Sequence, residues 1–261
     1  MPTAMRFLVL GLFLLPLTAP AALIKEPVEY QDGDTTLRGY LVYDEALPHK
    51  RPGILIAHEW WGLNDFVRER AERLADLGYV TFALDMYGDG RVTEHSNEAS
   101  AWMQQMTANQ EAWRHRALLG LEILKRHPMV DAERIAAIGF CFGGGTVMQL
   151  AYAGADLDGV VSFHGPLTPA ANTKPGDIKA SILVAHGEDD SFVPSEQIAV
   201  FKAALDAAQA DWQMIIYGGA RHAFTNPNAD SYGIDNVRYD PLAAKRSWAL
   251  MRVFLDEVFT P

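Results

Sequence analysis

The segment RIAAIGFCFGGGTVMQLAYA (Arg134–Ala153) decides how the fold is predicted, because it combines a strand, a tight turn and a helix. Arg134–Phe140 is a short apolar run typical of a buried strand, and Gly144–Ala153 is expected to be a helix. Cys141 stands between them, flanked at two residues' distance by Gly139 and Gly143. Side chains at those two positions would clash in a tight turn, so the pattern predicts a sharp elbow that lifts Cys141 out of a sheet.

Strands and helices alternate on both sides of this segment. The expected strands are Thr35–Tyr43, Gly53–His58, Tyr79–Leu84, Gly159–Phe163, Ser181–His186 and Trp212–Tyr217, with a hairpin turn at Asp32–Asp34 before the first. The expected helices are Asn64–Leu77, Ser96–Thr107 with Ser96 as its cap, Glu111–His127, Ser195–Ala208 and Leu242–Phe259. The alternation predicts an α/β fold, with a mostly parallel central sheet and helices on both faces. Ligands of such sheets bind beyond the carboxyl ends of the strands.

Composition and charge exclude several classes of protein. The chain has 261 residues, 49% of them hydrophobic and 21% charged, which is enough apolar material for one sizeable core. A net charge of −11 argues against binding to nucleic acid or to an anionic membrane surface. The single cysteine excludes a disulfide scaffold. Because no repeat or linker interrupts the chain after Leu23, we expect residues 22–261 to form one domain.

The first 21 residues have the three-part pattern of a signal peptide. Arg6 precedes an apolar run, Phe7–Leu17, and Ala19–Ala21 fits the site at which signal peptidase cuts. We therefore expect export to the periplasm or the medium, with no stable membrane association after cleavage. A buried N-terminal helix or a retained anchor is the alternative interpretation. A lipoprotein is not expected, because Cys141 is the only cysteine and does not follow the apolar run.

Cys141 is the candidate nucleophile. The sequence Gly139–Gly143 reads G-x-C-x-G, which is the nucleophile-elbow pattern with cysteine in place of serine. At a helix N-terminus the dipole favours a thiolate, and the Phe142 N–H points at a developing oxyanion. The alternative is a buried structural cysteine in a tight turn.

Candidates for the acid and the base follow later in the chain, in the order nucleophile, acid, base. Asp190 follows the strand Ser181–His186, and His222 follows the strand Trp212–Tyr217, so an acid there can orient an imidazole. Asp190 could instead belong to a turn or cap a helix. The competing bases, each also at the end of a predicted strand, are His58, His164 and His186; we expect these to be hydrogen-bonded wall residues.

The stretch HEWWG (58–62) superficially resembles a zinc-binding helix. Its fifth residue is Gly62, however, where the zinc-binding pattern needs a histidine, and the stretch ends a strand. Its position suits the second oxyanion donor, the Trp60 N–H. Glu59 could lie against Cys141 as a gate or a proton acceptor, or pair with a nearby arginine such as Arg91. We expect no metal site, because no ligand spacing repeats among the histidines.

With these residues placed, the sequence resembles the dienelactone hydrolase family of α/β-hydrolases. The matching pieces cover nearly the whole chain after residue 22 in the family's order: HEWWG (58–62), DMYG (85–88), GFCFGG (139–144), HGEDDSFVP (186–194) and GARHAF (219–224). The resemblance implies an α/β-hydrolase fold and a triad of Cys141, His222 and Asp190, with Glu59 contacting the thiol. It also implies carboxymethylenebutenolidase-like hydrolysis of small esters or lactones without a cofactor. An exported location departs from the cytoplasmic role that the family name suggests.

The substrate-binding residues depart from the family's pattern as well. Family members grip a substrate carboxylate with arginines, one of them four positions after the histidine, where this chain has Asn226. A second arginine is displaced here to Arg91, and Asp89 adds a negative charge beside it. Aromatic residues offer an apolar lining, although several could be ordinary core: Trp60, Trp61, Phe142, Phe192 and Phe224. We therefore expect small uncharged or aromatic esters to be better substrates than anionic dienelactones.

Two other functions remain open. A peptidase or acyltransferase on the same scaffold would need a large substrate platform or a cap domain, and the chain has no insertion of that size. A non-catalytic member that binds a small ligand is the other alternative, since a fold does not guarantee activity. The expected partner is a small ester or lactone, and a monomer is favoured; the sequence does not identify the physiological substrate.

Overall fold

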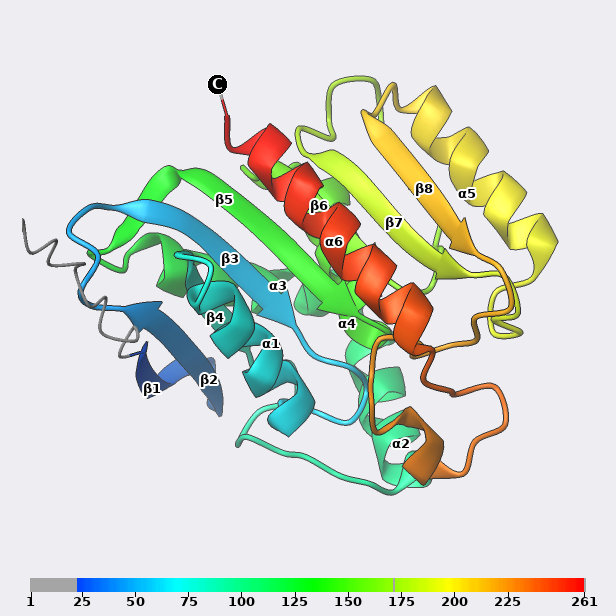
Figure 1. Ribbon diagram of the computed structural model, residues 1–261, viewed down its shortest axis with the longest axis horizontal. Coiled ribbons are helices and arrows are strands. Elements are labelled where there is room, and N and C mark those ends of the chain that lie inside the picture. Colours follow the sequence, from blue (N-terminus) through cyan, green and yellow to red (C-terminus); the bar gives the residue numbers. More distant parts are fainter. Residues whose placement is uncertain (1–22, 171, 261) are drawn as a thin grey trace, which may run out of the picture.

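The computed structural model describes residues 23–170 and 172–260, which form one sheet with helices on both of its faces (Figure 1). The strands are β1 (Leu23–Asp32), β2 (Thr35–Asp44), β3 (Arg51–Ala57), β4 (Val80–Leu84), β5 (Val130–Phe140), β6 (Gly159–Phe163), β7 (Ser181–Gly187) and β8 (Trp212–Tyr217). The helices are α1 (Asp65–Ala75), α2 (Ser96–Thr107), α3 (Gln110–Lys125), α4 (Phe142–Tyr152), α5 (Ser195–Ala207) and α6 (Pro241–Val258), with a 3₁₀ turn η1 (Ala229–Tyr232). The predicted α/β fold is confirmed.

The sheet has the order β1-β2-β4-β3-β5-β6-β7-β8. From β4 to β8 neighbouring strands are parallel, whereas β1–β2 and β2–β4 are antiparallel. The predicted turn joins β1 to β2, with Asp32 opposite Thr35 and Gly33 at a φ of +58°. The strand β1 itself was not expected, because its exposed and charged residues, LIKEPVEYQD, hide the alternation that marks a half-buried strand.

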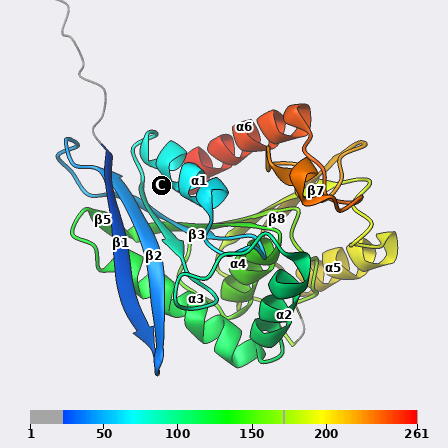
Figure 2. The same ribbon diagram turned by 90° about the horizontal axis from the view of Figure 1, so that it is seen from below.

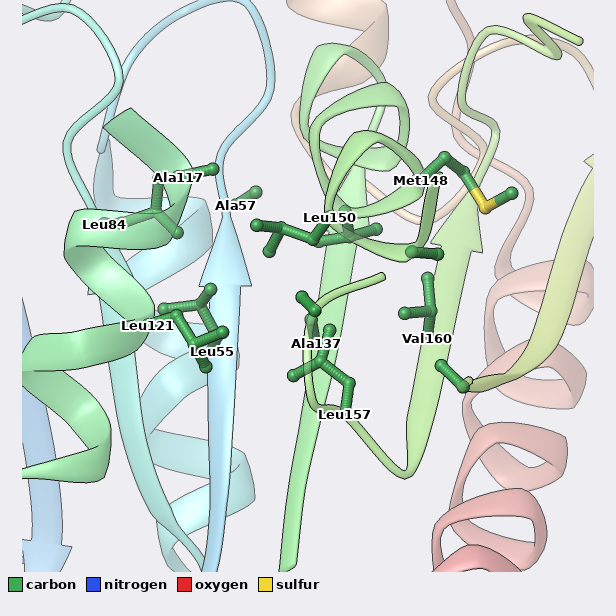
Figure 3. Packing of buried hydrophobic residues seen from close by; sticks show 14 of the residues in the cluster. Leu55, Ala57, Leu84, Ala117, Leu121, Ala137, Met148, Leu150, Leu157 and Val160 are labelled. Atoms are coloured by element: carbon green, nitrogen blue, oxygen red, sulfur yellow. The ribbon is translucent and has the colours of Figure 1, made fainter. Parts of the chain in front are cut away.

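Two apolar layers enclose the parallel strands (Figure 2). Alternate residues of β3 face opposite ways: Leu55 packs in the layer under α3 and α4, and Ile54 in the layer under α1 and α6. Figure 3 shows the first layer, where Leu121 of α3 lies near Leu55 of β3. Because both faces of the sheet are covered, its central strands read as continuous apolar runs.

The start of α4 and the cap of α2 differ from the sequence prediction. α4 begins at Phe142, directly after the elbow, although three consecutive glycines lower the helix propensity of Gly143–Gly145. Those glycines are required by close packing, because a Cβ at Gly144 would lie 2.6 Å from the Ser162 hydroxyl oxygen. Ser96 is the first helical residue of α2 rather than its cap, and His95 occupies the N-cap position.

The elbow at Cys141 is strained, as its sequence pattern predicts. Cys141 has a φ of +53° and a ψ of −120°, a conformation that residues with a side chain rarely adopt. A Cβ at Gly139 would overlap the Gly143 carbonyl, and one at Gly143 would overlap the Ala57 carbonyl in β3. The two flanking glycines therefore allow the strand, the turn and the helix to approach one another closely.

The predicted signal peptide, residues 1–21, lies outside the described residues. Within the part of the chain that is described, no helix has the length and apolar character to cross a bilayer.

We expect Gly139→Ala to destabilise the protein by more than about 3 kcal/mol, because the added methyl meets backbone atoms that cannot move away. Gly33→Ala is the control: it has open space, and its left-handed backbone alone costs about 1–2 kcal/mol. Urea unfolding of both variants measures the difference. Equal losses would show that the close approach at the elbow does not limit stability.

Candidate active site

The carboxyl ends of the parallel strands bring together the polar residues that the sequence analysis singled out. Cys141 follows β5, His164 follows β6, and Asp190 lies just after β7. His58 follows β3, and His222 lies beyond β8. Strand ends of a parallel sheet meet at one edge, which is why residues distant in sequence become neighbours here.

Cys141 and His222 line a cavity of about 490 Å³ at this edge. Its wall is largely apolar and is formed by Trp60, Met103, Thr107, Trp113, Cys141, Phe142, Pro166, Thr168, Phe192, Val193, His222 and Val237. The Cys141 side chain is half-buried, so a molecule in the cavity can reach its sulfur. His222 is the only histidine and Cys141 the only cysteine among these lining residues.

His222 and Asp190 form a close, buried pair. The Nδ1 of His222 lies 2.7 Å from Oδ2 of Asp190. The other carboxylate oxygen accepts hydrogen bonds from the Phe192 N–H at 3.0 Å and from the Asn236 amide at 3.2 Å. Burial alone would raise the pKa of Asp190, but these donors and His222 hold it below its usual value. The carboxylate is thus kept charged and fixed in orientation.

The second nitrogen of His222 is available to Cys141, because the thiol and the ring are within hydrogen-bonding reach. Burial alone would lower the pKa of His222, but the negative charges on Cys141 and Asp190 outweigh it and raise the pKa well above its usual value. Cys141, His222 and Asp190 therefore form a connected chain of side chains at the edge of the sheet.

The three competing histidines lie in different surroundings. His58 Nε2 accepts the Met86 N–H at 3.1 Å, so its proton is on Nδ1. His164 Nδ1 accepts the Cys141 N–H at 3.2 Å, and its Nε2 lies 2.7 Å from the Thr225 hydroxyl. Burial lowers the pKa of both rings, so they stay neutral. Both are hydrogen-bonded, as expected, but neither lines the cavity.

His186 departs from that expectation. It is buried in β7, yet neither ring nitrogen has a hydrogen-bond partner among the described residues. Burial lowers its pKa too.

The predicted oxyanion donors lie beside Cys141 in the same cavity wall. Phe142 is the first residue of α4, so its N–H has no acceptor within its own helix. Trp60 lies in the loop after β3, and its N–H donates to no backbone carbonyl within the described residues. Both N–H groups are therefore available as hydrogen-bond donors to a developing oxyanion.

Glu59 is buried and hydrogen-bonded to Asn226, whose amide donates to Oε2 of Glu59 at 2.7 Å. The other oxygen, Oε1, has no partner in the described part of the chain. Burial raises the pKa of Glu59 to about 7, although the Asn226 amide and the charge of His222 oppose the rise. The alternative pairing with Arg91 does not occur, because the Arg91 guanidinium donates to the carbonyls of Tyr87 and Gly88.

Of the residues expected to bind substrate, the structure places Trp60, Phe142 and Phe192 in the cavity wall. Phe192 is 52% exposed, and its ring centroid lies 5.0 Å from that of His222. It is therefore positioned at the mouth of the cavity.

The other expected substrate-binding residues lie elsewhere. Trp61 is buried and stacks on Tyr232 at a centroid distance of 4.0 Å. Phe224 is fully buried against His164, and Asn226 holds Glu59. Arg91 lines a separate, smaller cavity. The structure thus brings none of these four to the cavity wall.

The sequence analysis missed several lining residues. Met103 and Thr107 of α2 and Trp113 of α3 cover one side of the cavity, and Val237 lies on another. The spacing of Met103 and Thr107, one helical turn apart, was a usable signal. Asn236, which supports Asp190, gave no signal, because a lone asparagine in a loop has no pattern.

Across residues 23–170 and 172–260, no group of three or more His, Cys, Asp or Glu side chains is arranged to hold a metal ion.

The topology of the sheet, together with an elbow at the carboxyl end of β5, defines the α/β-hydrolase class. Within this class the chain belongs to the dienelactone hydrolase family, whose sequence model matches residues 37–259.

Solved structures and a sequence relative agree with this assignment. The structure m3DLH is 42% identical, covers 92% of this chain and 100% of its own, and superposes with a TM-score of 0.88. A dienelactone hydrolase-like promiscuous phosphotriesterase from metagenomic libraries is 40% identical over the same shares, with a TM-score of 0.87. A chain of Aquifex aeolicus, provisionally named a carboxymethylenebutenolidase, is 28% identical over 85% of this chain and 94% of its own.

We expect Glu59→Gln to remove a pH-dependent loss of stability. The pKa of Glu59 is about 7 in the folded protein and 4.5 in the unfolded chain, so the folded state binds the proton more tightly. The free energy of unfolding of the natural protein therefore falls as the pH rises from 4.5 through 7, by up to about 3 kcal/mol. The side-chain amide that this substitution introduces still accepts from Asn226 but carries no charge.

Urea unfolding at pH 4.5 and pH 8 measures this effect. The stability of the variant relative to the natural protein should rise by up to about 3 kcal/mol between these pH values. The control, Glu196→Gln on the exposed start of α5, should show no such rise. A flat difference for Glu59→Gln would mean that Glu59 ionises in the folded protein as freely as in the unfolded chain.

Proposed function

We propose that the protein is a cysteine-dependent hydrolase of small carboxylic esters or lactones, with Cys141 as nucleophile. The observation that carries the proposal is the connected chain of side chains in the cavity: the Cys141 thiol within hydrogen-bonding reach of His222, and His222 2.7 Å from Asp190. Membership of the dienelactone hydrolase family and the hydrolase names of its relatives support the same reaction class.

The first half of the reaction forms a thioester. The Cys141 thiolate attacks the substrate carbonyl carbon, and the Trp60 and Phe142 N–H groups donate to the resulting oxyanion. The carbon–oxygen bond to the leaving group then breaks, and the His222 imidazolium donates its proton to the departing alkoxide. Asp190 holds the ring in orientation and stabilises its charge throughout.

The second half releases the acid. Neutral His222 removes a proton from a water molecule, and the hydroxide attacks the thioester carbonyl at the same oxyanion position. Collapse of this intermediate expels the Cys141 thiolate and leaves His222 protonated, which restores the starting state. The strained conformation of Cys141 favours both steps, because it projects the sulfur into the cavity near the N-terminus of α4.

The cavity wall favours uncharged substrates. None of its lining residues is a lysine or an arginine, and Arg91 is turned away towards the carbonyls of Tyr87 and Gly88. A carboxylate placed in this wall would lose its hydration without meeting an arginine or a lysine, and the charge of His222 is already compensated by Asp190 and Cys141. Trp60, Trp113 and Phe142 instead offer flat apolar surfaces that suit an aromatic or alkyl ester.

The same wall favours a second candidate activity, on neutral phosphotriesters. A phosphotriesterase is 40% identical to this chain, and an uncharged triester fits an apolar cavity as an uncharged ester does. The Cys141 thiolate would attack phosphorus and displace the most acidic alcohol, and water would then release the phosphodiester.

A peptidase and a non-catalytic binding protein explain the geometry less well. A cavity of about 490 Å³ is of the size that holds a small molecule rather than a folded or extended peptide. Binding of a ligand alone does not require a thiol that is hydrogen-bonded to an imidazole and, through it, to a buried carboxylate. We further propose that residues 1–21 are a signal peptide, and that residues 22–261 act as one domain outside the cytoplasm.

We expect Cys141→Ala and His222→Ala each to lower kcat/KM for a phenyl ester by at least about 10³-fold, because nucleophile and base act as a unit. Asp190→Asn should cost less, since Asp190 orients the imidazole without reacting. His186→Ala is the matched control, a buried histidine at the end of the neighbouring strand β7, and should keep substantial activity. Circular dichroism shows whether each variant is folded.

A folded His186→Ala variant as inactive as His222→Ala would show that the base is misassigned. A thiol-directed acylating probe gives an independent check, because Cys141 is the only cysteine in the chain. No labelling of the natural protein would favour the non-catalytic alternative.

We expect kcat/KM to be higher for phenyl acetate than for an anionic dienelactone by at least about tenfold, because no lysine or arginine lines the cavity to grip the carboxylate. The two rates are compared at one pH and ionic strength, and a neutral 4-nitrophenyl phosphotriester in the same panel tests the second candidate. A preference for the anionic lactone would mean that an arginine reaches the cavity when substrate binds.

A further inference from the structure

A second cavity lies between α1 and α6, on the face of the sheet opposite to Trp113 and Phe142. Figure 2 shows these two helices side by side on one face, with α3 and α4 on the other. The cavity has a volume of about 240 Å³, and its floor is formed by Phe140 and Phe163, the last residues of β5 and β6. It shares no lining residue with the Cys141 cavity.

Positive charge is concentrated in this second cavity, although the chain as a whole carries a net charge of −11. Arg70 and Arg73 of α1 and Lys245 of α6 line it, together with one carboxylate, Glu69. Glu69 is 3.8 Å from Arg73, and both side chains are about half exposed, so this ion pair is weak. The cavity therefore keeps an excess of positive charge.

Arg70 is the buried member of the group. It is 6% exposed, and its Nη2 donates to the Thr225 carbonyl at 3.3 Å. Its Nε is buried without a hydrogen-bond partner among the described residues, and its guanidinium forms no salt bridge there, although the charges of Glu69 and Glu59 act on it from nearby. A buried guanidinium with an unsatisfied N–H is costly unless an acceptor reaches it. Burial and the neighbouring Arg73 lower the pKa of Arg70 to about 10, a direction that a bound anion would reverse.

Aromatic side chains also line the cavity. They are Trp248 of α6, Tyr239, Phe140 and Phe163. The guanidinium of Arg73 lies 4.4 Å from the Trp248 ring centre, and that of Arg70 lies 5.6 Å from it. Arginines stacked on a ring keep their N–H groups directed outward in the ring plane, where a planar acceptor can meet them.

We propose that this cavity is a binding site for a small aromatic carboxylate, distinct from the cavity that contains Cys141. The carboxylate accepts hydrogen bonds from Arg70, including its Nε–H, and lies between Arg73 and Lys245. The ring packs against Phe163 and Trp248. A guanidinium favours a planar carboxylate because its parallel N–H groups match both oxygens.

The test is calorimetric titration with benzoate after Cys141 has been alkylated with iodoacetamide. Since Cys141 is the only cysteine, alkylation blocks the other cavity alone. We expect saturable binding of benzoate, weaker binding of acetate and of inorganic phosphate, and none of benzamide, which has the same shape without the charge.

Variants of exposed residues assign the binding to this cavity without disturbing the core. Lys245→Gln and Arg73→Gln should each weaken benzoate binding by about tenfold. Arg246→Gln is the matched control, because Arg246 is the next residue of α6, is exposed and does not line the cavity. Its affinity for benzoate should equal that of the natural protein.

Three results would overturn the proposal. Benzamide binding as tightly as benzoate would show that charge is not recognised. Equal losses in Lys245→Gln and Arg246→Gln would show a general effect of surface charge. Benzoate binding that disappears on alkylation would place the anion in the Cys141 cavity. Because these experiments measure no turnover, their outcome is independent of the proposed hydrolysis.

Discussion

The close approach of strand, turn and helix at Cys141 is the constraint on which the rest of the structure depends. Cys141 adopts a left-handed conformation only because Gly139 and Gly143 leave room for carbonyl groups where a methyl would stand. Its N–H is held by the Phe163 carbonyl at 3.0 Å and by His164 Nδ1 at 3.2 Å. The neighbouring strand β6 therefore supports the elbow, and the sulfur projects from the edge of the sheet.

Burial disfavours the charged form of every ionisable group discussed around this elbow, and the partners of each group decide whether it keeps its charge. His58 and His164 have no charged hydrogen-bond partner, so desolvation keeps them neutral. His222 is just as enclosed, but Asp190 and Cys141 compensate its charge. Glu59 has only an amide, from Asn226, as its hydrogen-bond partner, and burial raises its pKa to about 7. Partners, rather than depth, decide which of these groups is charged.

The two cavities differ in charge because different elements line them. The Cys141 cavity takes its wall from α2, α3, the elbow and the loops after β3, β6, β7 and β8, and most of its lining residues are aromatic or aliphatic. The other takes its wall from α1 and α6, whose facing sides carry arginine and lysine. The loop that contains Thr225 lies between the two cavities. The Thr225 carbonyl accepts a hydrogen bond from Arg70, and the Thr225 hydroxyl is hydrogen-bonded to His164.

Local sequence patterns were sufficient to predict the fold, because hydrophobic periodicity and glycine spacing depend only on residues that are neighbours along the chain. The strands β2 to β8 and the elbow were predicted in this way, and chain order alone pointed to Asp190 and His222, which lie 2.7 Å apart. β1 was missed because its residues show no apolar alternation. The direction of a loop side chain is not a local property. Four residues were predicted from the sequence to line the Cys141 cavity and do not. Trp61 stacks on Tyr232, and Phe224 packs against His164. Asn226 donates to Glu59, and Arg91 donates to the Tyr87 carbonyl. Only the tertiary structure decides this, because a side chain takes the direction in which elements distant in sequence offer it contacts and hydrogen-bond partners.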